Sequence, residues 1–364
     1  MHDIMEYLKN AAESGASDLF LIAGAKAAYR IDGRMDKRGD RLQPCDTDEL
    51  VQSLYNNAGR EMSRFQSEGD DDFSFSVPGA ARFRINVYRQ RGSASMVIRV
   101  VPFGIPDPAE AHVPDAVMSL AGLREGLVLV TGTAGSGKST TQACIIDAIN
   151  KDRDDHIVTL EDPIEYLHRN AEGIVSQREI GIDTANYLTG LRACLREAPD
   201  VILLGEMRDA ETIQTAMTAA ETGHLVLATL HTKGAANAVD RMIDSFPSGQ
   251  QAQARAQMAM VVDTIVSQEL LPRTGGGRVP ACEILKFTPA VRSLVRDGKT
   301  HQLDAAMANG IPDGMVPMSH AVSGLLSAGL IDQATAAPYL HQDVQGQDRC
   351  SAFIGTRPRN NRKW

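Results

Sequence analysis

The chain has 364 residues, 43% of them hydrophobic, which is enough for about two or three domains with their own cores and excludes an intrinsically disordered chain. Lys and Arg number 37 against 46 Asp and Glu, so the net charge is −9 and the surface as a whole is not suited to hold nucleic acid by neutralising phosphates. Local basic patches are still compatible with this total.

Nothing in the sequence predicts a membrane-spanning or secreted protein. Apolar runs such as residues 127–131 and 225–230 are five or six residues long, whereas a membrane helix needs about 20. The first residues include Asp3 and Glu6 and lack a basic region followed by an apolar stretch, so we expect no secretory signal and a cytoplasmic protein. The five cysteines are scattered and never spaced Cys-x-x-Cys, which predicts reduced thiols and excludes a zinc ribbon.

Residues 1–101 are predicted to form a small mixed α+β domain. An amphipathic stretch at residues 4–12 precedes short apolar runs at 19–22 and 27–31. Asp46-x-x-Glu49 predicts a capping box that opens a helix over residues 49–57.

Two strands are predicted near the end of this domain. In residues 81–87, apolar side chains alternate with Arg82, Arg84 and Asn86, so one face is buried and the other presents guanidinium groups. A second strand at residues 95–100 carries Arg99. Residues 102–114 contain four prolines and little periodicity, the composition of a semi-rigid linker, and we place the domain boundary there.

Residues 115–345 change to short, continuously apolar strands that alternate with helical stretches, a pattern typical of an α/β fold with a parallel sheet covered on both faces. The candidate strands are residues 127–131, 156–160, 201–204 and 225–230. Helices are predicted at residues 140–150, 250–267 and 290–297, and a glycine-rich turn at 274–277 precedes a strand at 281–286. Residues 346–364 are predicted to be a basic, frayed tail.

A phosphate-binding loop is the strongest single motif. The pattern G-x-x-x-x-G-K-[ST] is matched between a buried strand and a helical stretch, which is the context this motif requires. Its residues are Gly132, Thr133, Ala134, Gly135, Ser136, Gly137, Lys138 and Ser139, followed by Thr140. We expect the backbone N–H groups to point at phosphate oxygens of ATP, Lys138 to bridge the β- and γ-phosphates, and the Ser139 hydroxyl to ligate Mg²⁺. The alternative is a glycine-rich turn with an accidental lysine.

Carboxylates follow two of the predicted strands, at the sheet edge where ligands of α/β proteins bind. Glu161 and Asp162 come directly after one strand, with Glu165 nearby, and Glu206 follows another. Glu206 is the candidate for holding Mg²⁺ and for activating water, and Glu161 is a second candidate catalytic acid. The alternative for each is a helix N-cap or a solvated loop acid.

Two histidines bracket the strand at residues 225–230. His224 and His231 are seven residues apart, so a straight strand turns them to opposite faces and they cannot share a metal ion. We expect His231 to contact the γ-phosphate or to orient Glu206, the alternative being a satisfied core histidine. For His224 the two interpretations stay open.

Taken together, these motifs resemble the secretion-ATPase superfamily of bacterial type II secretion and type IV pili, most closely its PilT-like retraction ATPases. The resemblance covers about residues 1–335. The phosphate loop, an acidic "Asp box" at 157–168, a Walker B segment with Gly-Glu-Met-Arg-Asp at 205–209 and a "His box" at 222–232 appear in the family's order. Residues 15–19 and 29–33 resemble its PAS-like N-terminal domain, and residues 290–296 resemble the Ala-Ile-Arg motif of retraction ATPases.

This resemblance implies a homo-hexameric ring of RecA-like ATPase domains that moves pilins, with no direct contact to nucleic acid. It implies an inner-membrane platform protein as partner, and a peripheral membrane location through partners alone. Extension and secretion ATPases are longer and usually carry a four-cysteine zinc motif, so the short chain favours retraction. A specialised or plasmid-borne pilus, or a type IV secretion machine, is the alternative.

The resemblance also implies that basic residues of the N-terminal domain close over the nucleotide, and Arg84 and Arg99 match those positions. The alternative is that they decorate a solvated sheet face. Second candidates, facing a neighbouring subunit, are Arg192, Arg196 and Arg208.

In the helix at residues 290–297, Arg292 and Arg296 are four apart and are predicted to form one exposed basic face, which contacts a neighbour or the platform. The alternative is two solvated charges.

The sequence disfavours two other functional classes. A DNA or RNA motor is disfavoured by the acidic total and by an aromatic content of 5%, because single-strand grooves need basic tracks and stacking rings. A nucleotide sensor without hydrolysis is disfavoured because Lys138, Ser139, Glu161 and Glu206 are all present.

Overall fold

The computed structural model describes residues 3–31, 33–102 and 104–340, so the predicted basic tail at 346–364 lies outside the described residues. The chain divides into two compact units, one of residues 1–105 with 164–169 and one of residues 106–163 with 170–364. None of the helices in the described ranges is long and apolar enough to cross a membrane.

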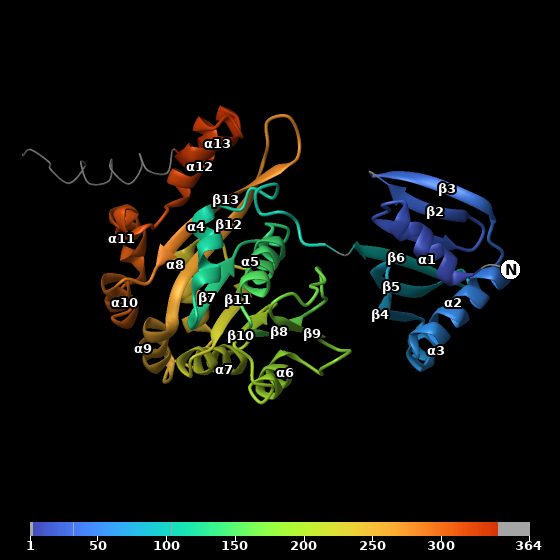
Figure 1. Ribbon diagram of the computed structural model, residues 1–364, viewed down its shortest axis with the longest axis horizontal. Helices are drawn as coiled ribbons and strands as arrows, with labels where there is room; N and C mark the ends of the chain where they lie inside the picture. Colours follow the sequence, from blue (N-terminus) through green and yellow to red (C-terminus); the bar gives the residue numbers. More distant parts are fainter. Residues whose placement is uncertain (1–2, 32, 103, 341–364) are drawn as a thin grey trace, which may run out of the picture. The chain divides into compact units, whose positions relative to one another are not determined.

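Within the described residues of the first unit, one antiparallel sheet has six strands in the order β3-β2-β1-β6-β5-β4, and α1 and α2 pack along it (Figure 1). Its elements are α1 (Ile4–Glu13), β1 (Asp18–Ile22), β2 (Lys26–Ile31), β3 (Arg34–Arg41), α2 (Pro44–Ala58), α3 (Ser63–Glu68), β4 (Asp70–Val77), β5 (Ala81–Gln90) and β6 (Ser93–Pro102). The alternation predicted along β5 is confirmed, because Phe83, Ile85 and Val87 are fully buried.

The predicted capping box is wrong in its position. Helix α2 begins at Pro44, five residues before the predicted start at Glu49, because proline suits the first turn of a helix. Asp46 therefore sits inside the first turn and accepts a 2.7 Å hydrogen bond from the backbone N–H of Gln43, which is the N-cap residue.

The second unit is built on a mixed sheet. Among its described residues, seven strands have the order β13-β12-β7-β11-β10-β8-β9, parallel except for the β12–β13 pair. Its strands are β7 (Gly126–Thr131), β8 (His156–Glu161), β9 (Ile174–Glu179), β10 (Val201–Leu204), β11 (Leu225–Leu230), β12 (Val262–Pro272) and β13 (Arg278–Lys286). The predicted α/β class and all four predicted apolar strands are confirmed.

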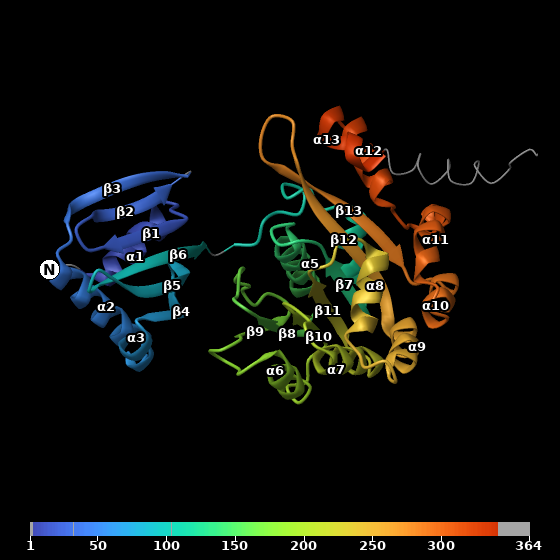
Figure 2. The same ribbon diagram turned by 180° about the vertical axis from the view of Figure 1, so that it is seen from behind.

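Helices lie on both faces of this sheet, with α5 in front in Figure 1 and α8 in front in Figure 2. The α-helices of the described part of this unit are α4 (Asp115–Met118), α5 (Lys138–Asp152), α6 (Tyr187–Cys194), α7 (Ala210–Glu221), α8 (Ala235–Asp244), α9 (Gln251–Val261), α10 (Pro289–Arg296), α11 (Leu303–Asn309), α12 (Met318–Ser327) and α13 (Gln333–Leu340). The buried strand residues pack mainly against α7, α8 and α9 in one core.

The helix predicted over residues 250–267 is wrong in its last third. Helix α9 ends at Val261, and β12 starts at the next residue and pairs with β7. The segment is rich in β-branched residues, which fit a strand better than a helix, and burial of both its faces hides the alternation that marks a half-exposed strand.

The exposed basic face predicted on α10 is also wrong for one of its two residues. Arg296 is exposed, but Arg292 is half-buried and its Nη1 donates hydrogen bonds to the carbonyls of Ala259 and Met260, the second at 2.8 Å. These carbonyls lie in the last turn of α9, where a cation satisfies groups that lack helical partners.

Single substitutions separate the two arginines. Arg292→Ala is expected to lower the free energy of unfolding by about 1–2 kcal/mol, because it removes charge-assisted hydrogen bonds to the end of α9. Arg296→Ala is expected to change it by no more than about 0.5 kcal/mol. Denaturant unfolding of both variants measures this, and equal effects would contradict the structural role of Arg292.

Candidate active site

Four predicted site segments meet because their strands are neighbours. In the parallel run β7-β11-β10-β8, Thr131 is in register with Leu230, and Leu204 with both Ala228 and Leu160. The carboxyl ends of these strands therefore place the phosphate loop, His231, Glu206 and Glu161 along one sheet edge, the usual position of ligands in α/β folds.

The phosphate loop connects β7 to α5. Gly135 and Gly137 have φ values of +75° and +88°, a conformation that glycine adopts without strain. Lys138 is the first residue of α5 and is 7% exposed, and its Nζ donates 2.9 Å hydrogen bonds to the carbonyl oxygens of Gly132 and Thr133. The ammonium group is thus held over the loop, where a phosphate would need it.

The loop fits an anionic phosphate group. Ser136 Oγ is buried and has no hydrogen-bond partner among the described residues, which leaves a donor for a ligand. A Cβ at Gly132 would lie 2.6 Å from this Oγ, so the backbone has room only for glycine. The N-terminus of α5 adds its dipole, and Ser139 and Thr140 place their hydroxyl groups in its first turn.

Glu206 is held between two basic side chains. Its Oε2 is 2.7 Å from Arg208 Nη2 and its Oε1 is 3.5 Å from His231 Nε2. Burial alone would raise the pKa of Glu206, but the hydrogen bond from Arg208 and the charges of His231 and Arg208 outweigh it and hold that pKa below its usual range. Glu206 is therefore an ionised carboxylate at neutral pH, available to a metal ion or a water molecule.

Glu161 lies at the end of β8 and accepts hydrogen bonds on Oε1 from the Thr159 hydroxyl at 2.6 Å and from Gln177 Nε2 at 3.1 Å. These donors orient its carboxylate. His224 Nδ1–H donates a 2.9 Å hydrogen bond to the carbonyl oxygen of Ala219, so it closes the end of α7.

Two residues of this site, Tyr187 and Gln268, are not predicted from the sequence. The side chain of Tyr187 packs against Gly205: a Cβ added at Gly205 would lie 2.9 Å from Tyr187 Oη. Burial, and then the negative charges of Asp162, Glu206 and Glu161, raise the pKa of this phenol, so it is neutral and able to donate. Gln268 on β12 is the other, and its side chain contacts the phosphate loop directly. Each comes from a distant part of the chain without a motif of its own.

Comparison with known proteins identifies the family. Residues 1–283 match the family described as type II/IV secretion system protein. The chain belongs to this family. This secretion system protein is 42% identical over 335 residues to the type IV pilus retractation ATPase PilT of Pseudomonas aeruginosa. The aligned residues cover 92% of this chain and 97% of that relative.

Two further comparisons support the same assignment. A twitching motility protein of Neisseria gonorrhoeae is 39% identical over 334 residues, which cover 91% of this secretion system protein and 88% of the relative. The crystal structure of the pilus retraction motor PilT with bound ADP superposes with a TM-score of 0.84 at 44% identity, over 93% of this chain and 97% of that one. The relatives match over both units, including the phosphate loop.

The candidate arginines of this secretion system protein lie in both units. In the first unit, Arg84 is exposed on β5 and is in register with Arg99 on β6, whose Nε donates a 3.2 Å hydrogen bond to Asp18 Oδ1. In the second unit, Arg192 lies 3.6 Å from a carboxylate oxygen of Glu211. Arg196 donates to the carbonyl of Arg192, and Arg208 pairs with Glu206 as described above.

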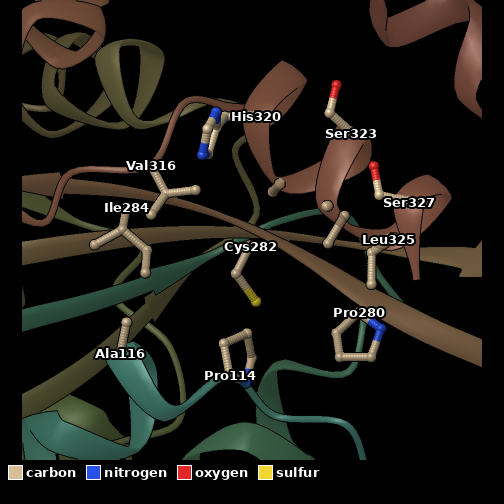
Figure 3. Close-up of a pocket in the computed structure, with 13 residues that line it drawn as sticks. Pro114, Ala116, Pro280, Cys282, Ile284, Val316, His320, Ser323, Leu325 and Ser327 are labelled. Atoms are coloured by element: carbon tan, nitrogen blue, oxygen red, sulfur yellow. The ribbon is translucent and has the colours of Figure 1, made fainter. Parts of the chain in front are cut away.

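A cavity of about 500 Å³ lies between β13, α12 and the residues at the start of α4 (Figure 3). Its lining is mainly apolar and includes Pro114, Ile284 and Leu325. Cys282 lies between this cavity and the phosphate loop. It lines the cavity, and its Sγ is 3.8 Å from Oε1 of Gln268, which contacts the loop.

Proposed function

We propose that this chain is an ATP-hydrolysing motor that drives retraction of a type IV pilus. The observation that carries the proposal is the placement of Lys138 in a phosphate loop on the same sheet edge as the ionised Glu206. The extent and identity of the match to the retraction ATPase PilT support retraction, not extension, as the movement that this motor drives.

The residues at this sheet edge have separate roles in binding a nucleoside triphosphate and in preparing it for attack by water. The N–H groups of the loop and of the first turn of α5 bind phosphate oxygens, and Lys138 bridges the β- and γ-phosphates. Glu206 polarises the attacking water, and His231 fixes one of its carboxylate oxygens. Mg²⁺, held by Ser139 and Glu206, would supply positive charge to the phosphates.

We assign residues 115–345 as a RecA-like ATPase domain with C-terminal helices and residues 1–101 as a PAS-like domain. Residues 102–114 are assigned as the linker and residues 346–364 as a basic tail. ATP biases the two domains toward one orientation only if it contacts both, and hydrolysis then removes the contacts of the γ-phosphate. The linker is the natural hinge of such a motor.

The active motor is proposed to be a homo-hexamer in which Arg84 and Arg99 complete an ATP site. A guanidinium placed on the γ-phosphate contributes about 10³–10⁵ in rate, because it meets the charge that develops in the transition state. The partner that receives the movement is the pilus platform protein, and through it the motor acts in the cytoplasm at the inner membrane.

Assembly is testable directly. Light scattering should show a particle of about six chains, and specific activity should rise with protein concentration where rings form. Arg84→Ala and Arg99→Ala should lose hydrolysis and keep the particle size. A stable monomer whose specific activity is independent of concentration would contradict the hexamer.

Turnover of the purified chain tests the enzyme assignment. We expect Mg²⁺-dependent release of phosphate from ATP, at a rate on the order of 1–10³ s⁻¹, that single-stranded DNA does not stimulate. No turnover at concentrations where rings form would support a nucleotide sensor instead. Strong stimulation by DNA would favour a nucleic-acid motor, and unchanged piliation in cells would favour a secretion machine.

A further inference from the structure

One buried amide connects the phosphate loop and the helix that follows it to the neighbouring strand. Gln268 on β12 is 1% exposed, and its Nε2 donates a 2.8 Å hydrogen bond to the carbonyl oxygen of Ser136 inside the loop. Its Oε1 accepts a 2.8 Å hydrogen bond from the hydroxyl of Thr141 in the first turns of α5. A single rigid group thus spans the loop and the helix that follows it.

The glycines of the loop are fitted to this residue. Ser267 is in register with Thr131 at the end of β7, so Gln268 lies beside Gly132. A Cβ at Gly132 would lie 2.3 Å from the backbone oxygen of Gln268, and a Cβ at Gly137 would lie 2.8 Å from its Nε2. The contact at Gly132 is with backbone and excludes a larger residue, and the φ of +88° at Gly137 disfavours one there, so the loop packs closely on Gln268 at both positions.

The amide is also supported from the opposite side. Cys282 on β13 places its Sγ 3.8 Å from Gln268 Oε1. Burial raises the pKa of this thiol to about 12, so the sulfur keeps its proton and is a donor to the amide oxygen. The Gln268 oxygen therefore accepts from two donors and its nitrogen donates to a carbonyl, so the amide cannot flip by about 180° without losing these hydrogen bonds.

We propose that Gln268 is a positioning residue that holds the phosphate loop in its phosphate-binding shape. A trans peptide directs its C=O and N–H to opposite sides, so the hydrogen bond to the Ser136 carbonyl turns the N–H of Gly137 away from β12. The hydrogen bond from Thr141 fixes the start of α5 at the same time. This inference rests on the proposed nucleotide hydrolysis and adds the residue that preorganises its binding loop.

The first test is the affinity for ADP, measured by titration calorimetry on the full-length chain. Gln268→Leu removes both hydrogen bonds at similar volume. It should weaken ADP binding about tenfold or more, because part of the binding free energy is then spent on ordering the loop. Thr141→Val removes one of the two bonds and should weaken it about two- to fivefold. ADP affinities within about twofold of wild type in both folded variants would overturn the proposal.

Gln268→Glu supplies a signature that a general loss of stability does not. The ionised carboxylate keeps the acceptor for Thr141 but repels the Ser136 carbonyl, whereas its protonated form restores a donor to that carbonyl. ADP binding by this variant should strengthen as the pH falls from about 8 to 6, since burial raises the pKa of such a carboxyl. A pH dependence of ADP binding equal to that of the wild-type chain would contradict the proposed contact, so this variant decides the matter even if Gln268→Leu does not fold.

The controls separate this inference from the proposed function. Glu269→Gln alters the next residue of β12, which pairs with Lys233 at 2.9 Å and accepts from Tyr339 instead of contacting the loop, so ADP affinity should stay within about twofold. If Lys138→Ala abolishes hydrolysis and Gln268→Leu binds ADP normally, only the role of Gln268 fails. If Lys138→Ala hydrolyses ATP normally, the proposed function fails.

Discussion

Lys138→Ala is expected to reduce the kcat of ATP hydrolysis by about 10² or more, because it removes the positive charge that stabilises the transferring phosphoryl group. The side chain is buried over the loop and donates to the Gly132 and Thr133 carbonyls, so the loss also frees two acceptors. These are backbone groups of a loop and not core volume, so the thermal midpoint should fall only modestly. Phosphate release at saturating ATP and a thermal melt measure both effects.

The matched control lies at the other end of the same helix. Lys151 in α5 is 65% exposed and pairs with Asp147 one turn earlier. Lys151→Ala removes the same type of side chain and should leave kcat within about twofold of wild type. Hydrolysis by Lys138→Ala above about a tenth of the wild-type rate would contradict the assignment of the phosphate loop.

Glu206→Gln is expected to bind ATP and to turn it over at least about 10²-fold more slowly than wild type. The amide keeps the shape of the side chain but loses the charge that polarises water and holds a metal ion. Binding of a fluorescent ATP analogue and single-turnover kinetics distinguish these two steps. Glu211→Gln, an exposed acid in the first turn of α7, is the control and should leave both unchanged.

The low pKa of Glu206 also predicts how the effect of Glu206→Gln depends on pH. Because that pKa lies below its ordinary value of 4.5, the carboxylate is ionised over the whole neutral range. Stability from its pairing with Arg208 is full above the ordinary value and is lost only as the pH falls through the lower, folded value. The ratio of wild-type to Glu206→Gln activity should therefore be constant from about pH 6 to 8, and loss of ATP binding would indicate a structural role instead.

The sequence predicts the central strands because each is a short apolar run buried on both faces and ended by a polar or glycine-rich segment. That rule predicts that the phosphate loop, Glu161, Glu206 and His231 lie at one sheet edge, as the strand register confirms. The same rule fails at Val262, because no glycine or proline separates the end of α9 from the start of β12.

The remaining features depend on contacts between distant residues. Gln268 is 132 residues from Ser136, and Arg292 is 33 residues from Ala259, so neither contact leaves a local pattern. Tyr187 likewise belongs to a helix whose own sequence contains no signal for the acids around it. Periodicity predicts which side chains are buried, whereas strand order decides which of them meet.

Surface piliation of the host cell tests the central claim most directly. The gene is deleted, and pili per cell are counted by electron microscopy after complementation with the wild-type chain, with Lys138→Ala or with Lys151→Ala at equal expression. A retraction motor predicts that pili accumulate in the deletion strain and in the Lys138→Ala strain, and return to normal with the wild-type chain and with Lys151→Ala. Loss of pili on deletion, or piliation that does not depend on Lys138, would contradict the account.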